Sequence, residues 1–343
     1  MSDLTPRFAV LAAWRLGLLL PLMLMPWLGR ADAFGRQVLF QLRGPLPLPD
    51  EVVLLGIDET SLDPQLADFG PWPWPRAVQA GLAREALRHG ARRVVFNIVH
   101  VGPSSFGPED DRTFDELLQP WKNRVLLSAS YVRQQLDGFE QVQLRQPLER
   151  SYPLGLSAFS LNDFGVVQAV PGMQSLAEML APFPLPHPRP LAHLAAGVRT
   201  PFRDEGIDFL GPSGHIPVIP AWSVATLPDA TWRDKIVIVG STAPSLGDQL
   251  ETPFGQQSGS EVLFSAIAGL SSGRGFRSLD PGSLAAVLVV WILLCHWRIA
   301  APSSAFITAI STGSLVLTAV LMTILSWSLG LWLPATALVL MPL

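Results

Sequence analysis

The sequence predicts an α/β domain, a three-layer sandwich with a mainly parallel sheet, flanked by transmembrane helices. Two observations lead to this prediction. In the middle of the chain, short continuous apolar runs alternate with segments of helical periodicity, which is typical of βαβ units with right-handed crossovers. At both ends the apolar residues are concentrated: of 343 residues, 49% are hydrophobic and 15% are charged, whereas soluble domains carry about 25% charge.

Charged residues are almost confined to residues 34–278. The acidic residues outside this range are Asp3, Asp32 and Asp280, and the basic ones are Arg7, Arg15, Arg30 and Arg298. The chain has a net charge of −4, and nucleic-acid binding needs a surplus of Lys and Arg, so we expect no nucleic-acid partner. The single cysteine, Cys295, lies in an apolar run, so the central domain forms no disulfide and no thiolate metal site.

The N-terminal apolar stretch, residues 8–28, has the length of a membrane anchor. Arg7 precedes it, and Arg15 within it can snorkel toward the interface. The same stretch is compatible with a signal peptide that is cleaved at Ala31-Asp32-Ala33. With either alternative, the segment after residue 34 is exported.

The C-terminal region, residues 279–343, predicts two complete spans, at residues 279–297 and 304–327, separated by a polar collar that includes Arg298. A third apolar run begins near Leu331 and has about 13 residues, fewer than the roughly 20 that a span needs, so we expect a truncated third helix and no output domain. The arginines near the ends favour an inner-membrane, multi-pass protein whose domain at 35–278 is extracytoplasmic.

The elements of that domain can be placed in order. Four apolar runs predict buried strands at residues 52–57, 92–99, 125–130 and 235–240. Helical spacing predicts helices at residues 77–91, 113–121 and 259–270, the second of them after an acidic loop at Glu109-Asp110-Asp111. Residues 135–203 are irregular, with predicted strands at 163–167 and 206–210 around a proline-rich run at 182–190. That run is either a surface excursion or a partner-binding motif.

Three passages contain polar, glycine and aromatic residues that the packing of a core does not require. They are Gly56-Ile-Asp58-Glu-Thr-Ser61 with Gly70-Pro-Trp72-Pro-Trp74-Pro-Arg76, then Asp208-Phe-Leu-Gly-Pro-Ser-Gly-His-Ile-Pro217, and then Lys235 to Thr242 with Gly247-Asp248, Thr252-Pro-Phe-Gly255 and Gly259-Ser-Glu261. Together with the flanking hydrophobic layout, they resemble the type-two CHASE domain of bacterial membrane receptors. The resemblance implies an exported α/β sensor domain, transmembrane helices and an effector such as a kinase or cyclase. Asn97 departs from the family, which typically has an aspartate there.

Ligands of open α/β sheets bind beyond the carboxyl ends of the parallel strands. We therefore expect a small polar ligand near a strand-end rim formed by Asp58, Glu59, Ser61, Asn97, Ser241, Thr242 and Asp248. Structural alternatives remain open for three groups: Asp58 as a turn cap, Ser241 and Thr242 as helix caps, and Asp248 as a partner of Arg76.

The segment Trp72-Pro-Trp74-Pro-Arg76 has two interpretations as well. It is either an aromatic gate over a pocket or a structural clamp in which Arg76 stacks on an aromatic ring or pairs with a carboxylate. No Walker loop, G-x-G-x-x-G, G-x-S-x-G or H-x-x-x-H pattern occurs, so we expect no catalytic residue, metal or cofactor.

The leading hypothesis is a membrane-anchored extracytoplasmic sensor that binds an unknown small molecule or partner and signals through its transmembrane helices. Its expected partners are membrane lipid, a small ligand and an effector kinase or cyclase on a separate chain, and a homodimer is left open. The alternatives are an exported hydrolase that uses Ser213, Ser241 and Asp58 at the strand ends, and an envelope scaffold.

Overall fold

The computed structural model describes residues 26–65, 69–136, 139–147, 152–181, 187–278, 290, 317, 320 and 330–332. The chain divides into two compact units. Residues 43–161 and 166–275 form the α/β unit, and residues 1–42, 162–165 and 276–343 form the other.

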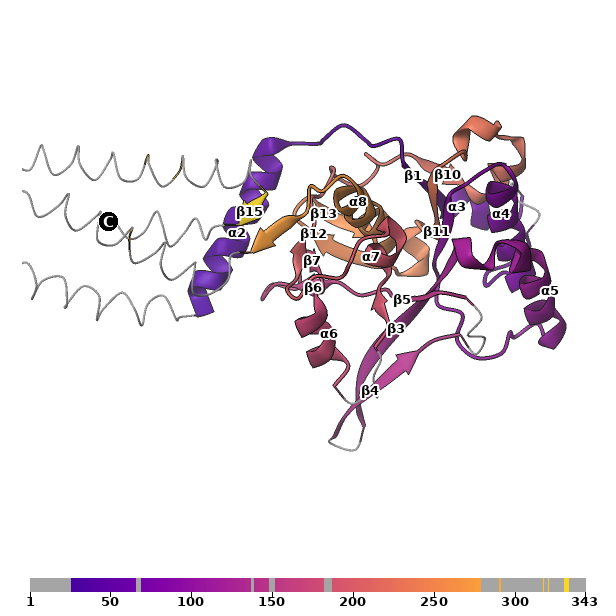
Figure 1. Ribbon diagram of the computed structural model, residues 1–343, viewed down its shortest axis with the longest axis horizontal. Coiled ribbons are helices and arrows are strands. Elements are labelled where there is room, and N and C mark those ends of the chain that lie inside the picture. The colour runs from indigo at the N-terminus through magenta and orange to yellow at the C-terminus, as the bar shows by residue number, and fades with distance from the viewer. Residues whose placement is uncertain are drawn as a thin grey trace, which may run out of the picture. The chain divides into compact units, whose positions relative to one another are not determined.

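A parallel sheet forms the centre of the α/β unit, which confirms the predicted α/β class (Figure 1). Seven of its strands pair in parallel along one path, and an eighth, β4, pairs antiparallel to β3. In spatial order the seven are β10 (Val218–Pro220), β1 (Val52–Ile57), β11 (Ile236–Ser241), β2 (Arg93–Asn97), β3 (Val125–Leu136), β5 (Leu154–Leu156) and β8 (Arg189–Pro190). The four predicted strands are therefore confirmed as neighbours near the middle of the sheet.

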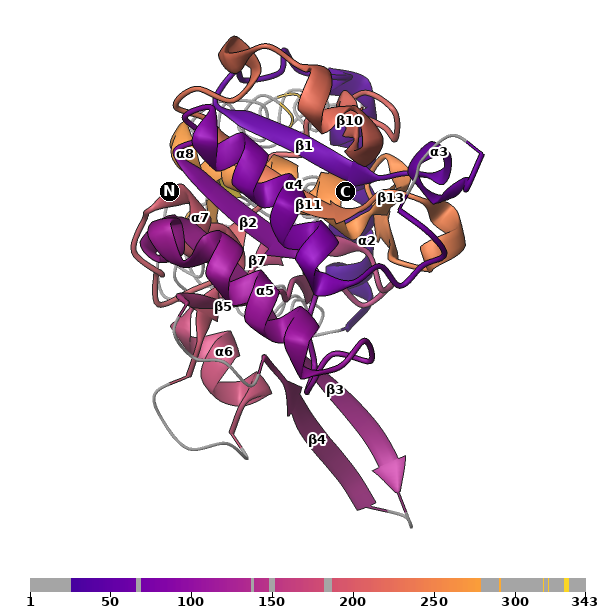
Figure 2. The ribbon, with the colours of Figure 1, turned by 90° about the vertical axis from the view of Figure 1, so that its right-hand side faces the viewer.

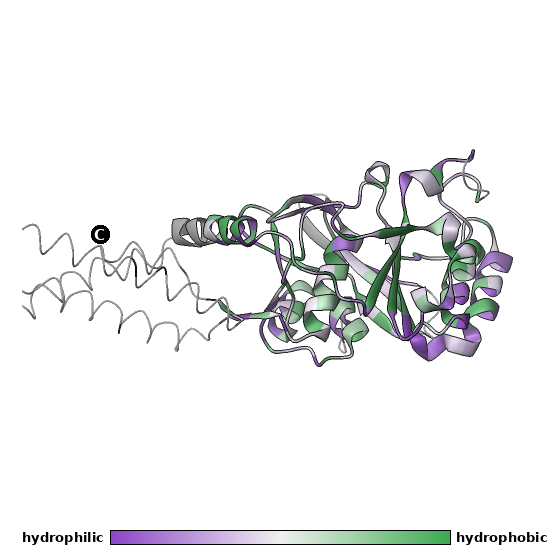
Figure 3. Ribbon diagram, turned by 90° about the horizontal axis from the view of Figure 1, so that it is seen from above, coloured by the Kyte–Doolittle hydropathy of each residue, from purple (hydrophilic) through white to green (hydrophobic). Residues whose placement is uncertain are grey.

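Helices cover both faces of this sheet, as Figure 2 shows. On one face lie α4 (Arg76–Arg88) and α5 (Pro108–Leu118), and on the other lie α7 (Leu191–Ala196) and α8 (Gly259–Ser271). Successive strand residues alternate between the faces: Val239 joins the core under α4, whereas a Cβ on the next residue, Gly240, would lie 2.3 Å from the Ser260 hydroxyl of α8. Because both faces are covered, the strands are the most hydrophobic part of the unit (Figure 3).

Smaller elements surround the sheet. A hairpin of β3 and β4 (Phe139–Arg145) projects from it (Figure 2). The other strands are β6 (Ser160–Leu161), β7 (Val167–Val170), β9 (Glu205–Gly206), β12 (Gln249–Thr252) and β13 (Gly255–Ser258). The other helices of this unit are α3 (Glu59–Leu62), α6 (Met173–Met179) and the 3-10 helices η1 (Gln119–Arg124), η2 (Ala221–Thr226), η3 (Asp229–Thr231) and η4 (Pro244–Leu246).

Three predicted elements have different bounds in the structure. Helix α5 begins at Pro108 rather than Thr113, so the expected acidic loop is its first turn. Gly107 has a φ of 94° just before it, and proline and acidic side chains both favour the first turn of a helix. The strand predicted at 163–167 begins only at Val167, after a turn, and the one predicted at 206–210 is reduced to Glu205–Gly206.

The other unit contains α2 (Pro26–Arg43, apart from its last residue), β14 (Phe276–Ser278) and β15 (Leu331–Trp332). Phe40 of α2 packs edge-to-face on Phe276, with ring centroids 6.1 Å apart. The predicted anchor at 8–28 lies outside the described residues except for 26–28, and so does the predicted region 279–343 except for 290, 317, 320 and 330–332. No helix in the described ranges has both the length and the hydropathy to cross a membrane.

Candidate functional site

The residues predicted after β1 form hydrogen bonds with other groups of the protein. Asp58 caps α3, because its carboxylate accepts the backbone N–H of Ser61 at 2.9 Å and the hydroxyl of Thr60 at 2.8 Å. The Ser61 hydroxyl accepts the backbone N–H of Ala221 at 3.0 Å. Glu59 accepts the backbone N–H of Ser245 at 3.0 Å. For Asp58 the structure therefore supports the turn-cap alternative.

Of the predicted polar residues at the ends of β2 and β11, Asn97 lies against the start of α8. Asn97 donates to the Ser260 hydroxyl at 3.2 Å and accepts a hydrogen bond from Ser157 at 2.9 Å. The hydroxyls of Ser241 and Thr242 are buried and have no hydrogen-bond partner, so the expected helix-cap role of these two residues is wrong.

Asp248 lies beside the first residue of α8, where its carboxylate oxygens come within 2.7 Å of the position that a Cβ on Gly259 would occupy. Burial raises the pKa of Asp248. The expected pairing of Asp248 with Arg76 is wrong, because Arg76 bonds to Asp111 instead, at 2.5 Å.

The segment from Trp72 to Arg76 is tightly packed. Trp74 is buried, its ring nitrogen donates to the Gly70 carbonyl at 3.1 Å, and its ring lies 5.4 Å from that of Trp72. The Trp72–Pro73 peptide bond is cis. These contacts match the clamp interpretation, in which the tryptophans hold the loop and Arg76 pairs with a carboxylate.

Asp110, which the sequence placed in an acidic loop, has a structural role that the sequence did not reveal. It is 8% exposed, and its two carboxylate oxygens each accept a backbone N–H at 2.9 Å, from Arg76 and Ala77. The residue before α4, Pro75, makes no side-chain cap, so a carboxylate from α5 caps α4 instead. Burial acts to raise the pKa of Asp110, but hydrogen bonds from Ser104, Ala77 and Arg76 outweigh it and lower the pKa below 3.8.

We expect Asp110→Asn to lower the melting temperature by about 2–8 °C. An N-cap contributes about 1–2 kcal/mol, each kcal/mol shifts a domain of this size by about 2–4 °C, and the amide replaces one acceptor with a donor. Because folding lowers the pKa, the carboxylate stabilises the fold above pH 3.8 and loses this effect as pH falls through the folded pKa. Thermal unfolding followed by tryptophan fluorescence measures the change. Glu109→Gln, in the same turn but exposed, is the control, and an equal shift there would contradict the capping role.

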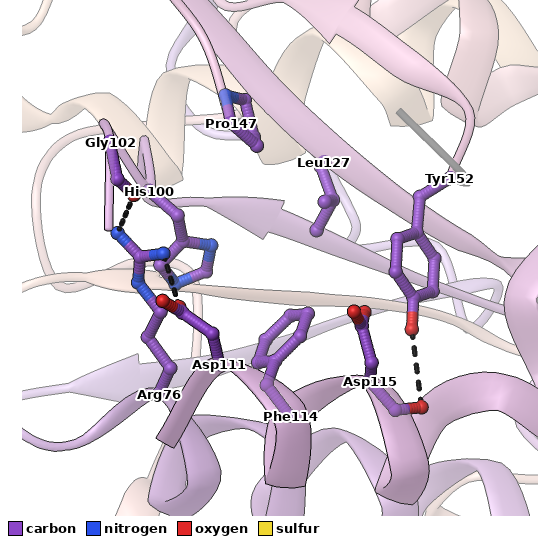
Figure 4. Close-up of a pocket in the computed structure, with 9 residues that line it drawn as sticks. All are labelled: Arg76, His100, Gly102, Asp111, Phe114, Asp115, Leu127, Pro147 and Tyr152. Atoms are coloured by element: carbon purple, nitrogen blue, oxygen red, sulfur yellow. Dashed lines mark hydrogen bonds and ion pairs between the residues drawn. The ribbon is translucent and has the colours of Figure 1, made fainter. Parts of the chain in front are cut away.

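Beyond the end of β2, on the face covered by α4 and α5, lies a cleft of about 160 Å³. Figure 4 shows Arg76, His100 and Asp111 at one end, Asp115 and Tyr152 at the other, and Phe114 between them. The remaining lining residues are Gly102, Leu127 and Pro147. We call it the Arg76 cleft; of the predicted site residues, it contains only Arg76.

Burial affects the pKa of one residue of the cleft in particular, His100. It is 7% exposed, and its Nε2 lies 2.9 Å from Oε1 of Gln79. Burial lowers the pKa of His100 to about 4, assisted by the nearby charge of Arg76 and opposed by the carboxylates of Asp111 and Asp110. Its Nδ1 is buried without a hydrogen-bond partner. The sequence pattern gave no signal for this residue, because a lone histidine after a strand resembles any loop histidine.

The hydrolase alternative required a nucleophile beside a base. Ser241 has no hydrogen-bond partner, Asp58 bonds to Thr60 and Ser61, and Ser213 is exposed. The proposed serines and Asp58 therefore form no such pair. In the described ranges, no group of three or more His, Cys, Asp or Glu side chains could hold a metal ion.

Comparison with known proteins gives one match. A family model described as the CHASE2 domain matches residues 10–297, which is most of the chain. No curated protein and no solved structure matches.

Proposed function

This chain belongs to the CHASE2 domain family, a family of extracytoplasmic sensory domains, and from that premise we propose that it is a membrane-anchored sensor with a small-molecule ligand site in the Arg76 cleft. The hydrophobic regions 8–28 and 279–343 hold it in the inner membrane. The output comes from an effector such as a kinase or cyclase.

The observation that carries this proposal is the buried, unpartnered Nδ1 of His100 in the wall of a cleft large enough for a small molecule. Buried polar atoms normally have a partner, because leaving one unsatisfied costs about 1–3 kcal/mol. A cleft that combines apolar walls with a few convergent polar groups is the usual form of a ligand site. A ligand supplies the missing partner.

In this proposal, the α/β unit connects to the membrane through two chain segments that Asp208 contacts. This buried carboxylate bonds to Arg43, the last residue of α2, and lies 3.9 Å from Arg274, just after α8. Arg43 also donates to the carbonyl of Phe209. One residue of the α/β unit therefore ties down both chain segments that lead to the hydrophobic ends.

The proposed topology predicts the result of reporter fusions. Alkaline phosphatase fused after residue 150 should be active, because it reaches the periplasm, and green fluorescent protein fused after residue 298 should fluoresce, because it remains in the cytoplasm. Exchanging the two reporters at each site is the control. Fluorescence at residue 150 with phosphatase activity at residue 298 would overturn the proposed orientation.

The proposed ligand site predicts the result of a screen. A library of small metabolites should contain compounds that raise the melting temperature of the purified full chain, because binding to the folded state stabilises it. Asp115→Trp, which fills the cleft, should abolish these shifts. Glu116→Trp places the same ring on the exposed neighbouring position and should retain them. Binders that are unaffected by Asp115→Trp would place the ligand elsewhere.

A further inference from the structure

Helix α2 carries a stripe of exposed apolar side chains. Phe34 is 65% exposed and Leu42 is 78% exposed, although both side chains are large and apolar. Val38, which is half-buried, lies between them. Residues that are four apart in the sequence lie on the same face of an α-helix. Phe34, Val38 and Leu42 therefore form a continuous row along the helix, which we call the α2 stripe.

A different face of α2 packs on the rest of its unit. Ala33 and Phe40 are buried, and Phe40 meets Phe276 of β14 edge-to-face. At 3.6 residues per turn, these two residues lie about 140–160° around the helix from Val38. The α2 stripe therefore faces away from the contact with β14, and a row of exposed apolar side chains is typical of a surface that meets a membrane or another protein.

The connections of this unit indicate what the α2 stripe meets. Helix α2 begins at Pro26, before the hydrophobic segment 8–28 ends. Phe34 is therefore only about 9 Å of helix beyond the end of that segment. Strand β14 ends at Ser278, where the hydrophobic region 279–343 begins. With both segments in the membrane, α2 and β14 are held at its surface.

The charge pattern of α2 and a neighbouring turn agree with a lipid surface. The charged residue between Phe34 and Leu42 is Arg36, about 160° around the helix from Val38, so the stripe itself is uncharged. The turn 162–165 belongs to the same unit. The side chain of Asn162 accepts the backbone N–H of Phe164 at 2.9 Å, and Phe164 is 55% exposed. Lipid accommodates apolar side chains from separate segments, whereas a protein partner needs a continuous patch of matching shape.

We propose that α2 lies along the surface of the membrane, with the α2 stripe and Phe164 in the lipid. Amphipathic helices of this kind bury their apolar face about 5–10 Å into the boundary between headgroups and acyl chains. The partner of this surface is therefore the lipid bilayer. The inference rests on the proposed function, since it requires the hydrophobic segments to hold the chain in the membrane.

Spin labels on single cysteines measure this depth. Cys295, the one native cysteine, is replaced by serine, and the labelled full chain is reconstituted in vesicles of phosphatidylethanolamine and phosphatidylglycerol. The labelled variants are Phe34→Cys, Val38→Cys, Leu42→Cys and Phe164→Cys. We expect their labels to be accessible to oxygen and protected from a water-soluble nickel chelate, as at a depth of about 5–10 Å. Phe106→Cys is the control, because Phe106 is a similarly exposed apolar residue of the α/β unit, and its label should remain accessible to nickel.

Extraction of cell membranes with alkaline carbonate separates this inference from the proposed function. If the chain stays with the membrane but nickel reaches the labels of the α2 stripe, the anchoring stands and the lipid contact of α2 is wrong. Protection from both oxygen and nickel, with spectral broadening that disappears on dilution with unlabelled chain, would mean that a second copy covers the stripe, which also overturns the inference. If carbonate releases the chain and nickel reaches the labels, both proposals fail.

Discussion

Asp208→Ala is expected to destabilise the α/β unit by about 3–5 kcal/mol. The side chain of Asp208 is 7% exposed and that of its partner Arg43 is 19% exposed. Removing one member of a buried ion pair is strongly destabilising, and its cost is of this order. The removed carboxylate also lies 3.9 Å from Arg274, so the substitution loosens both chain segments that lead to the hydrophobic ends.

Thermal unfolding of the full chain checks this expectation. At about 2–4 °C per kcal/mol, the melting temperature should fall by about 6–20 °C. The melting temperature of Asp208→Asn should lie between those of wild type and Asp208→Ala, because the amide retains an acceptor for Arg43. Asp163→Ala, at an exposed position, removes the same charge and should change stability by less than about 0.5 kcal/mol. An Asp208→Ala shift no larger than this control would show that the pair does not hold the chain ends.

The fold was predictable for those elements whose own residues indicate their secondary structure. Each of the four predicted strands contains consecutive apolar residues, because a parallel strand that is covered on both faces is buried on both. Helix α8 has a capping box between Ser258 and Glu261 and begins at the predicted residue. The hairpin of β3 and β4 was not predicted, although Asp137-Gly138, between the two strands, is a strong hairpin signal in the sequence.

The site was predictable only in part, because its contacts join distant segments. The rule of strand ends places Asn97 at the end of β2, where it bonds to Ser260. It gave no indication that Asp110 would cap a helix more than thirty residues earlier in the chain, or that Gln79 of α4 would bond to His100. These roles depend on how α4, α5 and the loop after β2 pack together, and no local spacing encodes that packing.

The second singled-out passage, Asp208 to Pro217, illustrates the same limit. As a sequence it contains a charge, glycines and a histidine, a composition that is compatible with a site or a turn. In the structure Leu46 donates its backbone N–H to the carbonyl of Leu210 at 2.7 Å, and its carbonyl lies 2.8 Å from Nε2 of His215. The passage therefore binds the chain segment that follows α2, and these contacts are structural.

Acidification from pH 7 to pH 4 is expected to destabilise the α/β unit by about 3 kcal/mol through His100 alone. The pKa of His100 is about 4 in the folded chain, against 6.5 for an unperturbed histidine. Between these values the unfolded chain binds more protons than the folded chain, so stability falls as pH decreases through the window and levels off below pH 4. A difference of about 2.5 pKa units at 1.36 kcal/mol each gives the magnitude. The groups that set this pKa, besides burial, are Arg76, Asp111 and Asp110.

The measurement is the melting temperature of wild type and His100→Gln at intervals between pH 7 and pH 4. Glutamine retains a polar group for Gln79 but does not titrate. Acidification should therefore lower the melting temperature of the variant by about 6–12 °C less than that of wild type. His187→Gln, outside the cleft, should keep the wild-type dependence. Equal slopes for wild type and His100→Gln would mean that His100 is not held neutral in the folded chain.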